Sequence, residues 1–134
     1  MTEPLPLVPI SYGELVDKIT ILETKLKHFK DASKRANTQT ELGLLLETAQ
    51  KNKIDLNHGL VKQLREVNQA LWDIEDWIRI EEQKQDFGPR FIELARSVYF
   101  ENDKRANYKK EINLLYGSRL IEEKEYVDYR SAAR

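Results

Sequence analysis

The chain has 134 residues, of which 40% are hydrophobic and 34% are charged, with only five glycines and four prolines. This length predicts a single domain spanning residues 1–134, and the shortage of glycine and proline favours long helices over a sandwich or barrel. The net charge of −1 gives no electrostatic basis for binding nucleic acid or an anionic membrane. The absence of cysteine excludes a disulfide framework, a thiolate zinc site and a cysteine nucleophile.

The N-terminal segment, residues 1–10, contains three of the four prolines. Proline fixes φ and donates no backbone hydrogen bond, so this segment is predicted to be an extended strap. It has no basic region followed by a long apolar run, and no part of the chain approaches 18 consecutive apolar residues. We therefore expect neither a signal peptide nor a membrane span. The expected location of the protein is the cytoplasm.

The first predicted helix begins at a capping box, in which the Ser11 hydroxyl accepts from the Glu14 amide and the Glu14 carboxylate reaches back. Apolar residues then alternate at spacings of three and four: Tyr12, Leu15, Ile19, Leu22, Leu26 and Phe29. This spacing is typical of a helix with one apolar stripe. The polar run 31–38 is interpreted as a loop, and a short second helix is predicted from about Thr38 to Ala49.

A third helix is predicted from about Leu60 to Lys84 and carries the longest apolar stripe of the chain. The stripe consists of Leu60, Leu64, Val67, Leu71, Ile74 and Ile78. Spacings that alternate between four and three are the heptad pattern of a helix that packs against another helix. Residues 50–59 indicate a break before this helix, with Asp55 or Asn57 as its cap; a single bent helix is the alternative.

A turn at residues 85–89 separates the third helix from a fourth, predicted from about Pro89 to Tyr116. A connection this short makes the two helices antiparallel. The tail, residues 118–134, is predicted to pack back on the helices or to be partly mobile. The expected fold is therefore all-α: an antiparallel hairpin or bundle of three long helices, with one short helix and the extended strap.

The fourth helix interrupts its apolar stripe with polar residues, among them Asn102 and Arg105. Because buried polar groups without partners are costly, these residues need partners on a neighbouring helix. Counting along the hairpin places Asn102 opposite Trp72 and Arg105 near Asn68. The sequence thus predicts a polar layer between the two hairpin helices.

Two interpretations of this layer stay open. It either fixes the register of the helices through satisfied hydrogen bonds, or it binds a sugar, phosphate or carboxylate. The candidate ligand-binding residues are Asn68, Trp72, Asp73, Asn102, Asp103 and Arg105. No catalytic residue and no cofactor is predicted. No metal site is predicted either, because Asp55 and His58 alone do not make one.

The pattern favours a non-enzymatic interaction or adaptor module. A hairpin leaves one apolar stripe uncovered, so we expect a homodimer; a different protein partner is the alternative cover for the same stripe. The alternative function is a small ligand-binding protein or an enzyme that acts at the polar layer on a sugar, phosphate or carboxylate.

Four segments carry a resemblance to a known family: VPISYGELVDKITILE (8–23), LWDIED (71–76), FIELARSVYFENDKRA (91–106) and GSRLIEEK (117–124). They resemble a family of small helical proteins of unknown function from bacteria, cyanobacteria among them, and phages. The family's short motif corresponds to Asn102, Asp103, Arg105 and Ala106, and its second hallmark to Gly117 and Ser118. Trp77 replaces a more polar residue of the family pattern, which suggests an oligomer contact if it faces outward.

The resemblance also implies a cellular setting. Some relatives are associated with surface-glycan genes, which implies a link to surface-glycan metabolism, or to a phage process in the host cytoplasm if the chain is phage-encoded. A fainter similarity to all-helical chorismate mutases implies an enzyme as an alternative. The several inward basic residues on separate helices that such an enzyme needs are not evident in this sequence.

Overall fold

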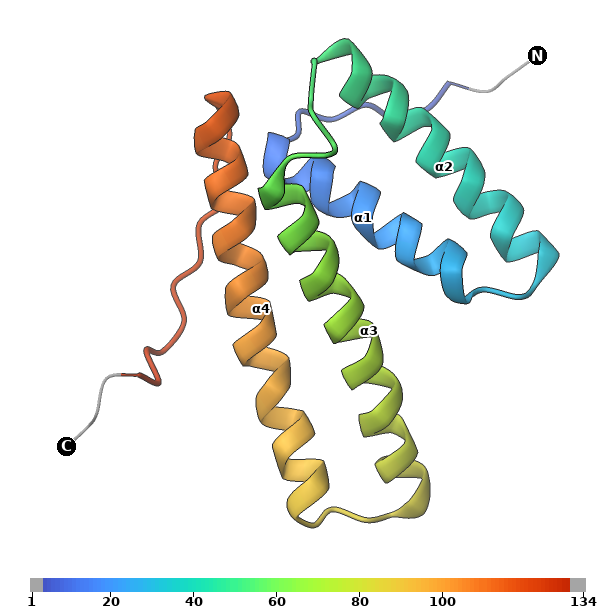
Figure 1. Cartoon of the computed structure of the whole chain (residues 1–134), viewed down its shortest axis with the longest axis vertical. Helices are drawn as coiled ribbons and strands as arrows, with labels where there is room; N and C mark the ends of the chain where they lie inside the picture. The colour runs from blue at the N-terminus through green and yellow to red at the C-terminus, as the bar shows by residue number, and fades with distance from the viewer. Residues whose placement is uncertain (1–3, 131–134) are drawn as a thin grey trace.

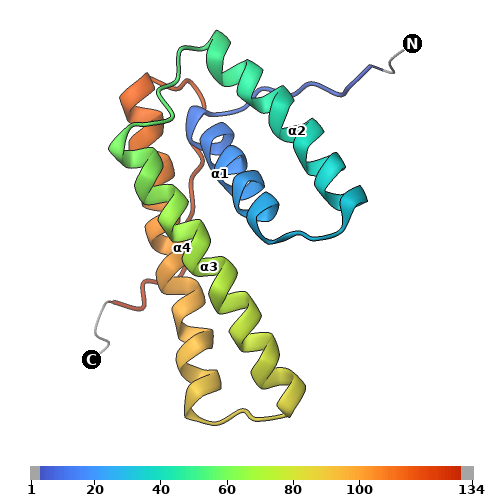
Figure 2. The same cartoon turned by 45° about the vertical axis from the view of Figure 1, so that its right-hand side comes forward.

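The computed structural model describes residues 4–130, which contain four α-helices and no strand. The helices are α1 (Tyr12–His28), α2 (Ala32–Lys51), α3 (Gly59–Lys84) and α4 (Pro89–Tyr116). Helices α3 and α4 form an antiparallel hairpin, and α1 and α2 lie beside the end of it that is remote from the turn (Figures 1 and 2). The all-α prediction and the hairpin are confirmed. No helix in the described part of the chain is long and apolar enough to cross a membrane.

The ends of α1 and α4 follow their sequence signals. Ser11 caps α1, and its hydroxyl accepts from the Glu14 amide at 3.1 Å. Helix α4 begins at Pro89, where its missing N–H costs no hydrogen bond. It ends at Tyr116, because Gly117 takes the left-handed conformation (φ 62°). The start of α1 and both bounds of α4 agree with the predicted ones, whereas α1 ends at His28, before the end near Lys30–Ser33 that the sequence predicts.

The cap of α3 differs from the prediction. His58, not Asp55 or Asn57, occupies this position, and its Nδ1 accepts from the Leu60 amide at 3.1 Å. Asp55 instead stabilises the preceding turn, where its Oδ1 accepts from the Asn57 amide at 2.9 Å. The predicted break is real, since residues 52–58 are not helical and the single bent helix is wrong.

Helix α2 is longer than predicted, and the polar run 31–38 is mostly helix rather than loop. It begins at Ala32, because the Asp31 carboxylate caps it by accepting from the Lys34 amide at 2.9 Å. Arg35 closes the tight α1–α2 connection by donating to the backbone oxygens of Leu26 and Phe29. The first turns of α2 are mostly exposed, so no apolar stripe marks them in the sequence.

The core lies where α1 crosses the base of the hairpin, which we define as residues 59–70 of α3 and 103–116 of α4. One cluster joins α1 to both hairpin helices through Val16, Val61, Leu64 and Ile112. A second joins α1 to α2 through Leu15, Ile19 and Ala49. Helix α2 packs on α1 and makes no close helix contact with the hairpin. Helix α1 is therefore the central layer of the fold.

The other end of the hairpin is residues 71–102, which we call the distal hairpin; a third helix reaches it only at its start, where His28 of α1 stacks on Trp72 (Figures 1 and 2). Among the described residues, only Ile74 and Leu94 are buried hydrophobic side chains within it. The rest of its apolar side chains are half-buried or exposed. Beyond Trp72, the distal hairpin is thus a two-helix layer without a covering helix.

The two terminal segments, the strap and the tail, differ in how they contact the helices. Residues 4–10 of the strap are extended; among them Leu5, Leu7 and Val8 are exposed, and Ile10 packs against the core. Residues 118–130 of the tail run back along α4 (Figure 1). The parts of both predictions that concern residues 1–3 and 131–134 lie outside the described residues.

Candidate functional site

A carboxylate on α1 occupies the centre of the polar layer. The Asp17 side chain is fully buried, and its Oδ1 accepts from Arg105 Nε at 3.0 Å and from Asn68 Nδ2 at 2.9 Å. Its Oδ2 accepts from Arg105 Nη2 at 2.5 Å. The paired contact with Arg105 has the fork geometry that makes arginine–carboxylate pairs strong. One residue of α1 therefore joins α3 and α4.

The remaining polar groups of the layer are also satisfied. Asn68 Nδ2 donates to the Thr20 hydroxyl at 2.8 Å, and that hydroxyl donates to the Asp17 backbone oxygen at 2.9 Å. Within the described residues, no buried side-chain nitrogen or oxygen lacks a hydrogen-bond partner. A fully satisfied network of this kind is what the register interpretation requires.

Lys109 on α4 forms a second buried cation next to this layer. Its Nζ donates to Glu14 at 2.7 Å and to Glu122 at 3.0 Å, and lies 3.8 Å from Asp17 Oδ2. Burial acts to lower the pKa of Lys109, but the hydrogen bonds to both glutamates outweigh it, so that its pKa is raised. The hydrogen bond to Asp17 likewise raises the pKa of Arg105. Both groups are therefore charged at neutral pH.

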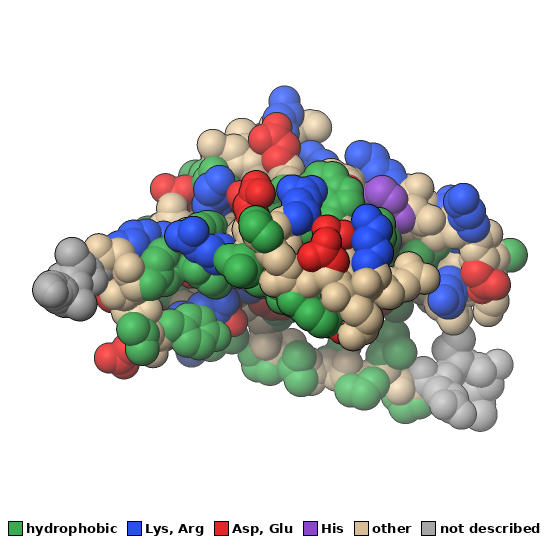
Figure 3. All heavy atoms as spheres, turned by 90° about the horizontal axis from the view of Figure 1, so that it is seen from below, with side chains coloured by type: hydrophobic (Ala, Val, Ile, Leu, Met, Phe, Trp, Pro, Cys, Tyr) green, Lys and Arg blue, Asp and Glu red, His purple; other side chains and the backbone are tan. Residues whose placement is uncertain are grey.

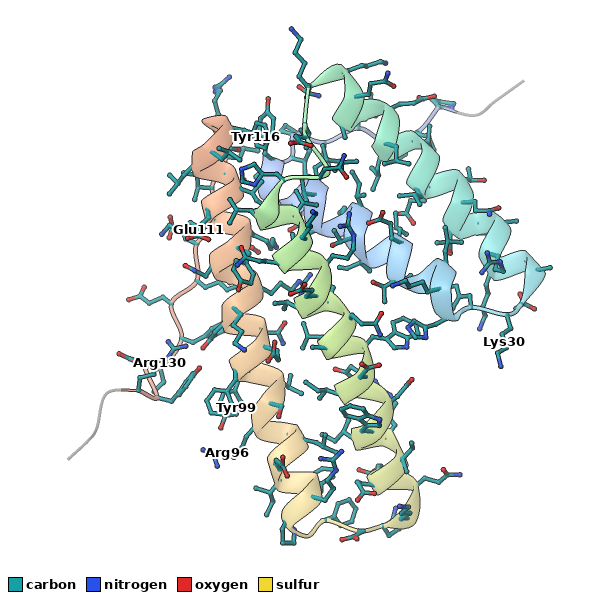
Figure 4. The ribbon with its side chains drawn as sticks, in the orientation of Figure 1. Lys30, Arg96, Tyr99, Glu111, Tyr116 and Arg130 are labelled. Carbon is teal, nitrogen blue, oxygen red and sulfur yellow. The ribbon has the colours of Figure 1, made fainter. Side chains whose placement is uncertain are left out.

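The N-terminal end of α1 touches the backbone of α4. The Gly13 amide donates to Asn113 Oδ1 at 2.6 Å. A Cβ at Gly13 would lie 2.3 Å from the Lys109 carbonyl oxygen. Beside this contact, Tyr12 stacks on Tyr116 with their ring centroids 5.1 Å apart, and Figure 4 places Tyr116 at the end of α4 next to α1. Only glycine allows the two helices to approach this closely.

An open groove of about 570 Å³ lies where α1 ends against the hairpin. Its lining comes from three helices: Ile21 and Thr24 of α1, Leu71, Glu75, Asp76 and Arg79 of α3, and the four predicted residues Asn68, Trp72, Asn102 and Arg105. The structure thus brings four of the six predicted site residues together beside one groove.

The other two predicted residues lie elsewhere. Asp73 accepts from Gln69 Nε2 at 3.2 Å and does not line the groove. Asp103 accepts from the Tyr129 hydroxyl and from Arg130 of the tail. Each follows a groove residue in the sequence, and one residue turns about 100° around a helix. The sequence prediction grouped residues that are neighbours along the chain but that the helix places on different faces.

Sequence reasoning missed Asp17, the most buried charged group of the site. A signal for it exists: Gly13, Asp17, Thr20 and Thr24 repeat at spacings of four, three and four. This small and polar stripe runs beside the apolar stripe of α1, and all four residues are buried. A polar stripe with helical spacing next to a core stripe predicts a polar contact with another helix.

The tail is attached to α4 at two places. Glu122 binds Lys109, and the Tyr129 ring packs on Tyr99 and Phe100 with centroids 5.0 and 5.5 Å apart. Figure 4 shows Tyr99 and Arg130 on the side of α4 that faces away from α3. A hollow of about 630 Å³ lies between the tail and α4, so the tail packs loosely between its two attachments.

The first attachment of the tail should depend on pH. The hydrogen bond from Lys109 lowers the pKa of Glu122 below its ordinary value of 4.5. A carboxyl with a lowered pKa in the folded state stabilises above its ordinary pKa and loses this effect as the pH falls through the lowered value. We expect the contacts between α4 and the tail near Glu122, measured as NMR cross-peaks, to weaken below that pH. The variant Glu122→Gln should show weakened contacts already at neutral pH, and equal contacts in both proteins would contradict the attachment.

Comparison with known protein families gives a match over most of the chain. The model of a family of unknown function, DUF6165, matches residues 7–133. No curated protein and no solved structure matched the chain. The match agrees with the resemblance to a family of unknown function and adds no activity, so the function has to be argued from the geometry.

Proposed function

We propose that this chain, which belongs to the DUF6165 family of unknown function, is a non-enzymatic interaction module that associates with a second copy of itself. The observation that carries the proposal is the uncovered distal hairpin. Helical domains bury the apolar stripe of each helix against a further layer, and the distal hairpin beyond Trp72 has none. A surface-glycan pathway or a phage process in the host cytoplasm is the proposed setting, on the strength of the resemblance alone.

The distal hairpin exposes large hydrophobic side chains on both of its helices and at its turn. Six of them are 37–54% exposed: Trp77, Ile80, Phe87, Ile92, Tyr99 and Phe100. Figure 3 views the molecule from the hairpin end and shows hydrophobic side chains among basic and acidic ones. Single exposed hydrophobic residues are common, but six within one short hairpin are typical of an interaction surface.

Charge favours one way of pairing two copies. Within the distal hairpin, α3 carries five acidic and two basic residues, and α4 carries two acidic and two basic residues. A twofold axis that pairs α3 of one copy with α4 of the other keeps the two acidic α3 segments apart. The result is a four-helix bundle built from two hairpins, a common way to cover such a layer.

The oligomeric state tests this proposal. We expect sedimentation equilibrium to give twice the chain mass for the natural protein. The double variant Trp77→Lys/Ile80→Lys should raise the dissociation constant of the dimer at least about 30-fold. Both side chains are about half exposed in the single copy, so the variant should keep its helix content, and its melting temperature should equal that of the natural chain diluted until it is monomeric. These two properties are measured by circular dichroism.

A matched control separates this surface from general surface hydrophobicity. Leu114→Lys changes an exposed leucine of α4 outside the distal hairpin, where the side chain is 64% exposed. This variant should remain a dimer. A monomeric natural chain at every concentration, or a double variant that dimerises as well as the natural chain, would overturn the proposal.

A further inference from the structure

We infer that the groove beside Trp72 binds a neutral ring compound that carries hydroxyl or amide groups. This chemistry is shared by nucleosides and uncharged pyranosides. The inference goes beyond self-association, since it concerns a small ligand rather than a second chain. It rests on the charges of the groove, on one preorganised donor and on a supported aromatic wall.

The charge balance of the groove opposes an anion. Both arginines that line it have carboxylate partners: Arg105 binds the buried Asp17, and Arg79 binds Glu75. Asp76 adds a further carboxylate to the lining. With two arginines against three carboxylates, a phosphate or carboxylate ligand would lose its hydration without gaining an uncompensated cation. A neutral ligand avoids this cost.

The groove still offers a hydrogen-bond donor in a fixed position. Two nitrogens of Arg105, Nε and Nη2, are held by Asp17. The third, Nη1, lies 3.5 Å from Asn102 Oδ1, beyond the usual range for a strong hydrogen bond. Because Asp17 fixes the guanidinium plane, Nη1 can donate to a ligand oxygen without losing further side-chain freedom. Asn102 adds an amide that can both donate and accept.

The aromatic wall is held in place from α1 and the α1–α2 connection. The His28 ring stacks on Trp72 at a centroid distance of 4.7 Å and an interplanar angle of 15°. Phe29 meets the indole at 6.1 Å and 61°. Trp72 lines the groove together with Leu71 and Ile21. A supported indole beside a polar edge suits a flat or ring-shaped ligand with one apolar face.

The two tryptophans make the test direct, because only Trp72 lines the groove. The labelled full chain gives two indole N–H signals in an NMR titration. The neutral probes are adenosine, uridine and methyl glucoside, and the charged counterparts are AMP, UMP and glucose 6-phosphate. We expect the neutral compounds of one class to move the Trp72 signal and leave Trp77 unchanged. Each phosphorylated counterpart should bind at least about fivefold more weakly, since one nearby like charge in water has this effect and a phosphate monoester carries more than one charge at neutral pH.

Matched variants complete the experiment. Asn102→Leu should abolish the movement of the Trp72 signal, whereas Asn107→Leu, the same change on the far side of α4 at the tail hollow, should retain it. A response to the nucleosides or to the glucoside identifies which source supplies the ring. No movement with any neutral probe at millimolar concentration, or tighter binding of the phosphorylated compounds, would overturn the inference. Neither of these two results affects the test of self-association, which measures the oligomeric state.

Discussion

Replacing Arg105 with methionine should lower the free energy of unfolding by about 3–5 kcal/mol, the usual cost of stranding a buried charge. Asp17 is 0% exposed, so its carboxylate cannot turn to water. Lys109 Nζ, 3.8 Å from Asp17 Oδ2, would remain as an ion-pair partner, which places the loss near the lower end of that range, but it is too far to replace the two hydrogen bonds that Arg105 donates. Among the described residues, Asn68 would remain as the one side-chain donor to the carboxylate. Urea denaturation followed by circular dichroism measures the loss.

Two further variants show whether the buried charge is the cause. Asp17→Leu/Arg105→Met removes both charges and should recover most of the stability, because an apolar pair of similar size can replace a buried ion pair. Arg65→Met breaks the partly exposed pair with Glu23 and should cost at most about 1 kcal/mol. A loss below that value for Arg105→Met alone would contradict the central role of Asp17.

Gly13→Ala should be nearly as damaging, with a loss of about 3 kcal/mol or more in the free energy of unfolding, the upper range for overpacking. The added Cβ would meet the Lys109 carbonyl oxygen at 2.3 Å and the Asn113 side chain at 3.0 Å. The first of these is backbone inside α4 and cannot move aside. Helix α1 would have to shift, which would also strain the Asp17 contacts. Thermal and urea unfolding measure the change.

Gly43→Ala is the matched control for this substitution. Gly43 lies inside α2 and has no atom within 4 Å of the added Cβ. Alanine favours helix over glycine by about 0.5–1 kcal/mol, so this variant should gain stability. If Gly13→Ala also gained stability, the close approach of α1 to α4 at this position would be wrong.

The elements with periodic stripes and clear end signals could be predicted from the sequence. The heptad stripe gave α3, and the turn at residues 85–89 gave the antiparallel α4 with correct bounds. Helix α2 was predicted too short, because its first half is polar on nearly all sides and so has no stripe. Its cap, Asp31, lies in the run that composition alone marks as a loop.

The candidate site could be predicted only on the hairpin side. Asn68 and Arg105 were paired by counting residues along two helices joined by a short turn. That count gives no information on α1, whose position depends on packing between segments distant in the sequence. The polar stripe of α1 indicates that Asp17 contacts another helix, but Arg105 lies 88 residues away, and no local pattern identifies it as the partner. The polar layer is therefore a three-helix layer rather than a contact within the hairpin.

The central claim is that this layer holds α1 on the base of the hairpin and leaves the distal hairpin for a second copy. Hydrogen exchange at two protein concentrations tests it most directly. The amides of residues 71–84 and 89–102 should exchange more slowly at the higher concentration, while those of α1 should not change. Equal exchange of the distal hairpin at both concentrations, or protection that rises in α1 instead, would contradict the claim.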